Sequence, residues 1–514
     1  MNLGALVTRN AGMLPDKEAL IFEQERYTWY QVNDLVNRFA NTLIDAGFTK
    51  GDTALLWMEN SDLFVIAFYA VVKAGGVAVP VNYRLAKPEA EYIFTHSDAV
   101  ALVFDDGFEP IVRELEPNLV SITQYYSSGP GRFARYDPLQ SMLREGSPEE
   151  PAVSVDEDDL SEILYTAAFD GTPRGAVFTH HSQMVLAASA LSVLGLCTDD
   201  IILHMAPLFH GAQLNLYLNP GTYVGATHVI RRNMPPYKDV LLLMEKERIT
   251  QVFGPPVMYS MLMNEEEFEA YDLSSIRRFA YGAAPMSAEK VREMLKKFGR
   301  TDFVCLCGLI EGGPGGVALP PDRQVQKAGS GGMYAVNMEW KLTDEGGETI
   351  TRPGVAGELA LRGETIMTGY YKDPDATKEI IRDGWLFTGD VGVMDSDGCV
   401  TLVGRKKDLI ITGGENVYAR EVEIAVGGHP GIKDVAVIGM PHSEWGETVM
   451  AVIVADGPEP PTLSRLREFL EQKIADYKIP RILEVMEELP RSETGEVSKD
   501  LLREMFRHRD FKTG

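Results

Sequence analysis

Cysteine is scarce in this sequence, since only four occur among 514 residues. Cys197, Cys305, Cys307 and Cys399 form no CxxC pair, and no histidine lies at a zinc-site spacing from them. We therefore expect neither a disulfide framework nor a metal held by the protein. Such sparing use of cysteine is typical of proteins in a reducing cytoplasm.

Basic residues are also in the minority: 49 Lys and Arg oppose 75 Asp and Glu, and the formal net charge is −26. This charge repels nucleic-acid phosphates and anionic membrane surfaces, so we expect neither as a partner. Long apolar runs are lacking too, because Lys73 and a glycine pair interrupt the most apolar stretch, 64–80. The N-terminal residues lack the pattern of a secretory signal, and we expect a cytoplasmic protein.

The sequence has the composition of a folded globular protein, with 45% apolar and 24% charged residues, and its length predicts two or more domains. Between residues 30 and 260, helical-period stretches alternate with short apolar runs such as 53–57, 77–80 and 251–254. This alternation predicts α/β layers of mostly parallel strands. From residue 336 onward, short strands with Gly and Asp-Gly turns predict a small antiparallel β subdomain. After Asp408 the pattern indicates a separate α+β lobe.

Seven short segments carry the residues with chemical potential. They are Tyr165–Gly175, Pro207–Gly211, Tyr281–Ser287, Cys307–Glu311, Gly384–Asp390, Gly404–Asn416 and Trp445–Glu447. Alone, a loop such as 165–175 is more often a surface turn than a ligand site. In this order and at these spacings, however, the segments resemble the motif set of the adenylate-forming superfamily, which contains acyl-CoA synthetases, luciferases and nonribosomal adenylation domains. The resemblance extends from about residue 18 to residue 503.

The resemblance implies an enzyme that activates a carboxylate with Mg-ATP to an acyl adenylate and then lets the thiol of CoA displace AMP. A small lobe swings between the two steps. The implied organisation is an N-terminal acyl- and nucleotide-binding domain, residues 1–407, and a mobile C-terminal lid domain, residues 408–514, with a hinge near Asp408.

The resemblance also assigns residues to the nucleotide and the thiol. A small-residue turn lets a flat base lie against backbone, and a carboxylate accepts hydrogen bonds from two ribose hydroxyls. The implied acyl-adenylate site consists of Gly282, Ala283, Ala284, Pro285, Cys307, Gly308, Asp390 and Arg405. The implied CoA site, where absent side chains leave room for pantetheine, consists of Gly413, Gly414, Glu415, Tyr477 and Lys478. Without the family context, 408–416 reads as an ordinary hairpin turn.

The implied acyl pocket and its gate comprise His210, Gln213, Met258, Gly312 and Gly313. Their surroundings are largely apolar, with glycines in place of bulk, which favours a large hydrophobic acid over acetate. A lone histidine is often a satisfied structural residue, so for His210 a gate and a packing role both stay open.

The phosphate loop departs from the family pattern. Ala167, Ala168, Phe169 and Asp170 stand where the family has Ser-Gly-Thr-Thr, so three hydroxyl donors are missing. Asp170 also puts a negative charge where a polyphosphate would lie, and Arg174 is the only cation left to replace the family lysine. We expect weak triphosphate binding.

Three further positions bear on adenylation. Cys307 and Ile310 replace the aromatic that stacks on adenine and the threonine that contacts phosphate, while the metal-binding Glu311 remains for use if Mg-ATP binds. Glu496 stands at the position of the lysine that orients the carboxylate and the α-phosphate. A carboxylate about 4 Å from a phosphate costs about 4 kcal/mol at an effective dielectric near 20.

These losses all fall on the first half-reaction, so the sequence favours an acyl-CoA ligase that has lost adenylation and retains thioesterification. Such an enzyme takes an acyl adenylate from a separate adenylating ligase, transfers the acyl group to CoA and releases AMP, without using Mg-ATP. The same losses resemble the non-adenylating ligases of platensimycin- and platencin-type antibiotic biosynthesis, which implies a bulky diterpenoid acyl group. Two alternatives stand beside this hypothesis: a full two-step ATP-dependent synthetase, and an inactive binding or scaffold homologue. The oligomeric state, with a homodimer as one option, is not readable from the sequence.

Overall fold

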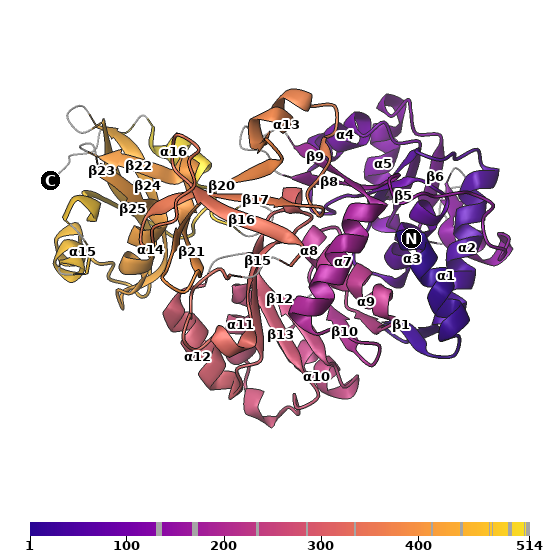
Figure 1. Cartoon of the computed structure of the whole chain (residues 1–514), viewed down its shortest axis with the longest axis horizontal. Helices are drawn as coiled ribbons and strands as arrows, with labels where there is room; N and C mark the ends of the chain where they lie inside the picture. The colour runs from indigo at the N-terminus through magenta and orange to yellow at the C-terminus, as the bar shows by residue number, and fades with distance from the viewer. Residues whose placement is uncertain are drawn as a thin grey trace. The chain divides into compact units, whose positions relative to one another are not determined.

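A computed structural model describes residues 1–129, 136–166, 173–232, 236–283, 286–333, 336–412, 415–442, 446–471, 473–474, 476–491, 496–507 and 509, with 415, 416 and 446 described by their backbone alone (Figure 1). The chain divides into two compact units. The first comprises Met1–Trp340 and Leu361–Leu386, and the second comprises Lys341–Ala360 and Phe387–Gly514.

The first unit contains two eight-stranded sheets. In spatial order, the strands of the first sheet are β15 (Gly316–Leu319), β14 (Phe303–Gly308), β13 (Arg278–Gly282), β12 (Gln251–Gly254), β10 (Ile201–His204), β11 (Thr227–Ile230), β1 (Glu18–Phe22) and β2 (Glu25–Thr28). Neighbours from β14 to β1 are parallel, and the two outer pairs, β14 with β15 and β1 with β2, are antiparallel.

In spatial order, the strands of the second sheet are β18 (Gly369–Tyr370), β9 (Arg174–Thr179), β8 (Leu160–Thr166), β4 (Val77–Pro80), β3 (Thr53–Trp57), β5 (Ala101–Phe104), β6 (Gln124–Ser127) and β7 (Asp137–Pro138). Neighbours from β8 to β7 are parallel, whereas β9 pairs antiparallel with both β8 and β18. Parallel strands need crossover connections, and helices supply most of them here.

The helices of the first unit are α1 (Leu3–Met13), α2 (Trp29–Asp45), α3 (Asp62–Lys73), α4 (Lys87–His96), α5 (Glu109–Leu115), α6 (Leu139–Glu145), α7 (His180–Leu194), α8 (Gly211–Gln213), α9 (Asn219–Val224), α10 (Tyr237–Lys246), α11 (Pro256–Met263), α12 (Ala288–Phe298) and α13 (Pro374–Ile380). Between α8 and α9 the chain forms a π-helical turn, Leu214–Leu218. This turn is the most unusual backbone of the unit, because π-helical hydrogen bonding is rare and concentrates at functional sites.

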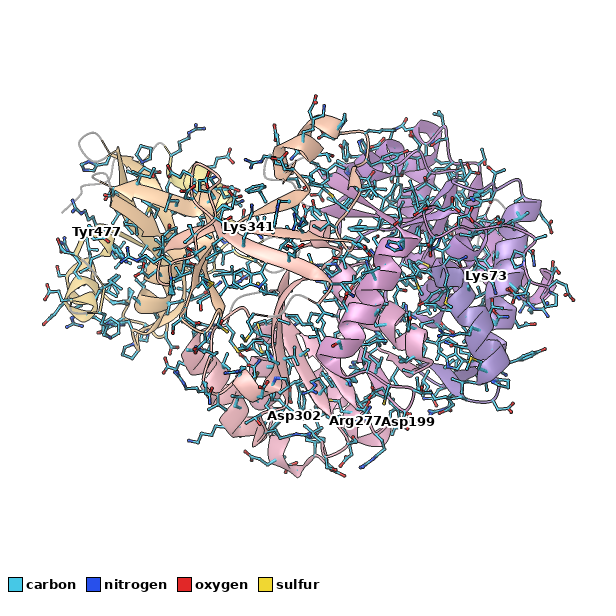
Figure 2. All side chains as sticks on the ribbon, in the orientation of Figure 1. Lys73, Asp199, Arg277, Asp302, Lys341 and Tyr477 are labelled. Carbon is cyan, nitrogen blue, oxygen red and sulfur yellow. The ribbon has the colours of Figure 1, made fainter. Side chains whose placement is uncertain are left out.

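The apolar stretch 64–80 forms most of α3 and all of β4, both of which are buried. No described helix is long and apolar enough to cross a bilayer. Lys73, which interrupts the stretch, ends α3 with its Nζ 2.7 Å from Asn33 Oδ1, 2.6 Å from Asn37 Oδ1 and 2.8 Å from a Glu150 carboxylate oxygen (Figure 2). The buried ammonium is therefore paired and hydrogen-bonded, which is what burial of a charge requires.

Two further sheets have five strands each. The first of them contains β16 (Met338–Thr343), β17 (Ala356–Gly363), β20 (Trp385–Met394), β19 (Ile381–Arg382) and β21 (Val400–Arg405). The C-terminal sheet contains β23 (Glu415–Tyr418), β22 (Leu409–Thr412), β25 (Gly446–Ala455), β24 (Ile432–His442) and β26 (Ile482–Met486). Alternate residues of β24 enter two different cores, since Val437 packs with residues of α14 (Ala419–Gly427) and α15 (Leu463–Leu470), and Ile438 packs with residues of α16 (Lys499–Phe506).

The predicted fold class is confirmed: α/β layers of mostly parallel strands precede a small β subdomain and a smaller α+β C-terminal part. The apolar runs 53–57, 77–80 and 251–254 coincide with β3, β4 and β12. The compact units divide the chain at other places than the predicted 1–407 and 408–514, because β16, β17 and β20 each contain residues of both units. The hinge near Asp408 stays a prediction.

Candidate functional site

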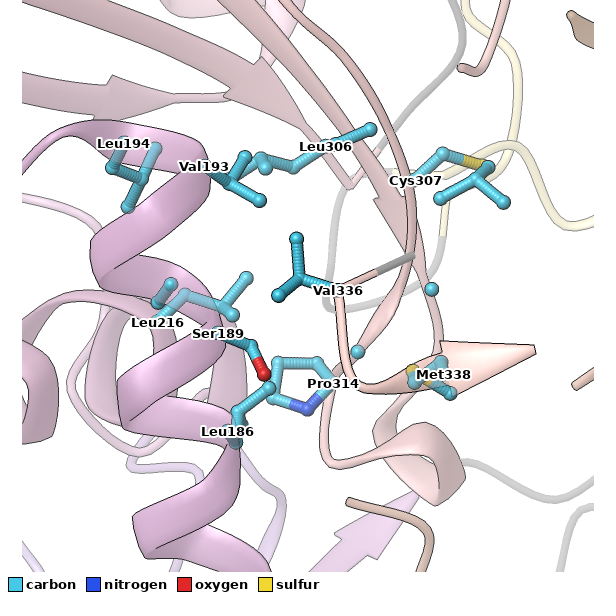
Figure 3. Close-up of a pocket in the computed structure, with 15 residues that line it drawn as sticks. Leu186, Ser189, Val193, Leu194, Leu216, Leu306, Cys307, Pro314, Val336 and Met338 are labelled. Atoms are coloured by element: carbon cyan, nitrogen blue, oxygen red, sulfur yellow. The ribbon is translucent and has the colours of Figure 1, made fainter. Parts of the chain in front are cut away.

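An apolar cavity of about 50 Å³ lies in the first unit between α7 and the β14-β15 hairpin (Figure 3). Figure 3 shows Leu186 and Val193 of α7 on one side and Leu306 and Pro314 on the other. Most of the described lining is hydrocarbon, and the Ser189 hydroxyl and the sulfurs of Cys307 and Met338 belong to it as well. The full lining is Leu186, Ser189, Ala190, Val193, Leu194, Leu216, Leu306, Cys307, Pro314, Gly315, Gly316, Val317, Ala318, Val336 and Met338.

None of the five predicted pocket residues, His210, Gln213, Met258, Gly312 and Gly313, lines this cavity, although Leu216, Leu306 and Pro314 lie close to them in the sequence. The predicted acyl pocket stays a prediction. Met258 instead is fully buried in a separate core that contains residues of α10, α11 and α12, and it does not line this cavity. Sequence reasoning missed the contribution of α7, whose largely apolar segment from Leu186 to Leu194 looks like ordinary core in the sequence.

His210 and Gln213 have structural partners. His210 is the N-cap of α8, and its Nδ1 accepts a hydrogen bond from the Ala212 amide at 3.2 Å. Burial lowers the pKa of His210, so the imidazole is neutral at pH 7. Gln213 is completely buried, and its Nε2 lies 2.7 Å from Nδ1 of His204. The observed cap favours a packing role for His210, and its role as a gate stays a prediction.

The glycines of the predicted adenylate site are required by close approach of backbones. A Cβ on Gly282 would lie 2.3 Å from the carbonyl oxygen of Leu306, and one on Gly308 would lie 2.4 Å from that of Pro314. Ala283, the residue after Gly282, has a φ of 62°, which costs a non-glycine residue of order 1 kcal/mol. The predicted Ala284 and Pro285 lie outside the described residues.

Of the pocket glycines, Gly313 has a φ of 103°, and Gly312 is buried at the end of the 3-10 turn that carries Glu311. The Thr365 hydroxyl donates to the Gly312 carbonyl at 2.9 Å. Ile310, which stands where the family has a threonine, packs against the core that contains residues of α1, α2 and α3. These residues therefore hold the turn that leads away from β14.

Glu311 and Arg174 belong to one cluster of the first unit. The Tyr370 hydroxyl donates to Glu311 Oε1 at 2.7 Å, and the Arg174 guanidinium lies over the Tyr370 ring, 5.8 Å from its centre. Arg174 also pairs with Asp373, Nε to Oδ2 3.2 Å. Burial and the Glu311 charge raise the pKa of Tyr370, so its hydroxyl stays protonated. Sequence reasoning missed Tyr370 and Asp373. The positions at which the family's phosphate-binding residues are replaced, Ala167, Ala168, Phe169 and Asp170, lie outside the described residues.

In the second unit, the two predicted ribose ligands face each other. Asp390 of β20 and Arg405 of β21 are directly opposite in an antiparallel pair, and Asp390 Oδ1 lies 3.1 Å from Arg405 Nε. The Asp390 side chain is 17% exposed and that of Arg405 is 42% exposed. A carboxylate that accepts one hydrogen bond from a guanidinium keeps lone pairs for further donors.

Asp408, the predicted hinge, is tied to the C-terminal helix. Its Oδ1 lies 2.7 Å from Nη2 of Arg503, and its Oδ2 lies 3.9 Å from Nζ of Lys499. Lys499 also pairs with Glu423 at 2.7 Å, and Lys407 pairs with Asp500 at 3.3 Å. Helix α16 thus forms ion pairs with both Lys407 and Asp408 at the predicted hinge.

The predicted CoA residues are described only in part. Gly413 and Gly414 lie outside the described residues, and the backbone of Glu415 pairs with Thr412 in the β22-β23 hairpin. Lys478 Nζ lies 2.6 Å and 2.8 Å from the two carboxylate oxygens of Glu421, and 5.7 Å from the centre of the Tyr477 ring.

Two further predictions concern charge and metal. Glu496 is exposed. Within the part of the chain that the structure describes, no group of three or more His, Cys, Asp and Glu side chains is arranged to hold a metal ion. Glu311 offers one carboxylate, which suits Mg²⁺, an ion that uses one or two carboxylates together with substrate phosphates.

Known proteins resemble the chain over almost its full length. The family model of AMP-binding enzymes matches residues 7–371, and that of the AMP-binding enzyme C-terminal domain matches residues 421–496. The feruloyl-CoA synthase of an Amycolatopsis species is 33% identical over 98% of this chain and 99% of its own. The long-chain-fatty-acid–CoA ligase FadD13 of Mycobacterium tuberculosis is 32% identical, with 98% of each chain covered.

A solved structure shows the same fold. The crystal structure of the anthranilate CoA ligase AuaEII in complex with anthranoyl-AMP superposes with a TM-score of 0.90 and 26% identity, covering 98% of this chain and 97% of that one. The expectation of a diterpenoid acyl group is tested by none of these relatives and stays a prediction. The family models and the full-length relatives agree with the motif order, and the chain therefore belongs to the AMP-binding enzymes of the adenylate-forming superfamily.

Proposed function

We propose that this chain joins a hydrophobic carboxylic acid to CoA by way of an acyl adenylate. The observation that carries the proposal is the apolar cavity against β14. The same strand ends at Gly308 and leads to Glu311, two residues that the family pattern assigns to the adenylate and its metal. An apolar wall beside a nucleotide site is what an acyl-activating enzyme needs to select its acid.

The size of the cavity bears on the acid. A cavity of about 50 Å³ suits a small apolar group, such as the end of an acyl chain or the edge of a single ring. A bulky polycyclic acid requires α7 and the β14-β15 hairpin to separate further. A hydrophobic acid with a slender terminus is therefore the better supported substrate.

The relatives support a full two-step, ATP-dependent route. Each named relative is a CoA synthase or ligase, and the AuaEII structure holds an acyl adenylate. In this route Glu311 would hold Mg²⁺ with the phosphates, and the ion would offset the negative charge that develops there. Asp390 would receive the ribose hydroxyls.

Thioesterification alone is a second candidate, and specific observations favour it. Glu496 is an exposed carboxylate at the position of the adenylation lysine. Arg174, the cation of the phosphate loop, is paired with Asp373 and stacked on Tyr370. In this candidate a separate ligase supplies the acyl adenylate, and CoA displaces AMP from it.

A two-arm assay separates these candidates. One arm offers Mg-ATP with ferulic, anthranilic and octanoic acids and measures acid-dependent pyrophosphate exchange. The other offers the synthetic adenylates of these acids with CoA, without ATP, and measures thioester by mass. Exchange together with thioester supports the two-step enzyme, and thioester from adenylates without any exchange supports the half-reaction. Absence of thioester in both arms would refute the proposed function and favour an inactive binding homologue.

A further inference from the structure

A chain of hydrogen bonds begins at a buried carboxyl group of β8. Glu162 is completely buried, and its Oε1 accepts a hydrogen bond from Nδ2 of Asn215 at 2.5 Å. Asn219 Nδ2 donates to Asn215 Oδ1 at 3.0 Å, and the Tyr69 hydroxyl donates to Asn219 Oδ1 at 2.9 Å. The side chains involved are all buried, so water does not compete for these bonds.

The chain of bonds continues to the other sheet. The Tyr69 hydroxyl lies 2.9 Å from Thr222 Oγ1, which lies 3.2 Å from Nε2 of His228. His228 Nδ1 lies 2.9 Å from Nε2 of His204. The other ring nitrogen of His204, Nδ1, lies 2.7 Å from Nε2 of Gln213. We call this series of hydrogen-bonded side chains, from Glu162 to Gln213, the relay. It connects β8 of the second sheet with β10 and β11 of the first.

Two residues that line the apolar cavity, Leu216 and Pro314, lie next to residues that this series of hydrogen bonds holds. Asn215 lies in the π-helical turn, and its neighbour Leu216 lines the cavity. Asn215 Nδ2 also lies 3.4 Å from the carbonyl oxygen of Gly313, the residue that precedes the lining residue Pro314. π-helical turns are rare and occur frequently at functional sites, and this one has a side chain, Asn215, that is held from outside the turn.

Glu162 carries a proton at neutral pH, because burial raises the pKa of its carboxyl group to about 8. Its Oε2 has no hydrogen-bond partner among the described residues, and no cation faces it there. The other titratable members of the relay stay neutral between pH 6 and 9. Burial raises the pKa of Tyr69 far above this range, lowers that of His204 to about 3, and lowers that of His228 well below its usual value.

We propose that Glu162 is a positioning residue for acyl binding: its neutral carboxyl group holds Asn215, and through Asn215 the two cavity walls, so that loss of the proton loosens the acyl site. The inference rests on the proposed function, because it identifies the cavity as the acyl site. It adds a residue that touches neither acid nor nucleotide and acts only through Asn215.

The size of the effect follows from linkage. A buried carboxylate with no cation beside it needs water, so the ionised form is compatible only with a rearranged π-helical turn. If the turn must open when the proton leaves, the apparent acyl KM rises by the factor 1 + 10^(pH − pKa). For a pKa of about 8 this factor is about tenfold at pH 9 and near one at pH 6.5.

The test measures KM and kcat for thioester formation from synthetic octanoyl and feruloyl adenylates between pH 6.5 and 9.5. We expect the wild-type adenylate KM to rise about tenfold between pH 6.5 and pH 9, apart from any change in kcat. The Glu162→Gln variant keeps a neutral acceptor at all pH values, so its KM should change less than twofold over this range. An alkaline rise of equal size in both proteins would overturn the inference.

Two further variants separate positioning from folding. Asn215→Leu removes the link at similar volume and should show a raised, pH-independent adenylate KM. Asp62→Asn neutralises another buried carboxyl of raised pKa, which bonds the Tyr27 hydroxyl at 2.8 Å outside the relay, and should keep the wild-type alkaline rise. Loss of the rise in Asp62→Asn would show that general loosening, and not Glu162, is responsible.

Amide hydrogen exchange of the segment 211–224 tests, without an enzyme assay, whether loss of the Glu162 proton opens the π-helical turn. Relative to the intrinsic exchange rate, wild-type exchange should accelerate about tenfold between pH 7 and pH 9, and that of Glu162→Gln should not. If no adenylate yields thioester, the proposed function fails, and exchange alone then decides whether Glu162 controls the turn. If exchange responds but the KM does not, the relay is structural only and the positioning role is refuted.

Discussion

At the residue scale, Asp390 and Glu162 show how environment sets the use of a carboxyl group. Asp390 is paired with Arg405 at 3.1 Å, and a carboxylate in such a pair has further lone pairs that can accept ribose hydroxyls. Glu162 is completely buried without a cation and keeps its proton at neutral pH, which suits a neutral acceptor for Asn215. The same chemical group thus forms an ion pair at one position and an uncharged hydrogen-bond acceptor at the other.

The first prediction concerns Asp390→Asn. Loss of hydrogen bonds to a charged acceptor costs about 1.5–3 kcal/mol, so we expect the affinity for octanoyl adenylate to fall about 10- to 100-fold. Titration calorimetry measures this affinity directly. Thr401→Ala, at an exposed position of the neighbouring β21, is the control and should bind within twofold of wild type. Unchanged affinity in Asp390→Asn would remove Asp390 from the ribose site.

The second prediction concerns the pH dependence of stability. The folded-state pKa of Glu162, about 8, lies above the ordinary value of 4.5, so the stabilisation from its neutral form is fully present below pH 4.5 and is lost as the pH rises through about 8. Glu162→Gln lacks this loss. We therefore expect the free energy of unfolding of the variant, relative to wild type, to increase by about 3–5 kcal/mol between pH 4.5 and pH 9.

Urea unfolding at pH 4.5, 7 and 9 measures this difference. Glu266→Gln, a neutralisation at an exposed position, is the control and should show a flat difference across the same range. A flat difference for Glu162→Gln as well would mean that Glu162 is already ionised in the folded protein.

At the element scale, α16 holds the predicted hinge. Arg503 pairs with Asp408 at 2.7 Å, and both side chains are mostly shielded, at 29% and 13% exposure. Such a pair contributes more than a fully exposed one, whose typical value is below about 1 kcal/mol. The π-helical turn is the other element that depends on distant partners, since its Asn215 is held from β8.

The third prediction is that Arg503→Met releases α16. The variant keeps the aliphatic stem but leaves the Asp408 carboxylate with only Lys499 at 3.9 Å. We expect a loss of about 1–2 kcal/mol in the free energy of unfolding of the second unit, together with faster amide exchange in 499–506. Arg507→Met, just beyond the helix at an exposed position, should change neither quantity. Equal exchange in the two variants would show that the Asp408 pair does not hold α16.

At the scale of the whole molecule, a net charge of −26 opposes compactness. Self-repulsion among so many carboxylates destabilises the folded state, and salt screens it with a Debye length of about 10 Å at 0.1 M.

The fourth prediction follows from this charge. We expect the thermal midpoint at pH 7.5 to rise by several degrees between about 10 mM and 300 mM NaCl, because screening of the net charge outweighs the weakening of exposed ion pairs. Differential scanning calorimetry at several salt concentrations provides the measurement. A midpoint that falls with salt would indicate that favourable ion pairs dominate the electrostatics of the folded state.

The predictable features of this protein are those encoded locally. Apolar runs such as 53–57 and 251–254 predicted strands with their bounds, because a strand's burial is written in consecutive residues. Gly282 and Gly308, which the motifs assigned to the adenylate, lie where the backbone carbonyls of Leu306 and Pro314 leave no room for a side chain, and their contact with a nucleotide stays a prediction. The lining of the cavity by α7 was missed, because an apolar helix face has the same pattern whether it meets packed core or an open space.

The sequence by itself determined the α/β class, the motif order of the adenylate-forming superfamily and the charge reversal at Glu496, because each depends on residue identity and local spacing. Only the tertiary structure decided which carboxyl groups are charged and which polar groups meet. Glu162 and Asn215 are 53 positions apart, and Asp408 and Arg503 are 95 apart. Such contacts depend on how sheets and helices pack over the whole chain, and burial, which sets the charge of a carboxyl group, exists only after that packing.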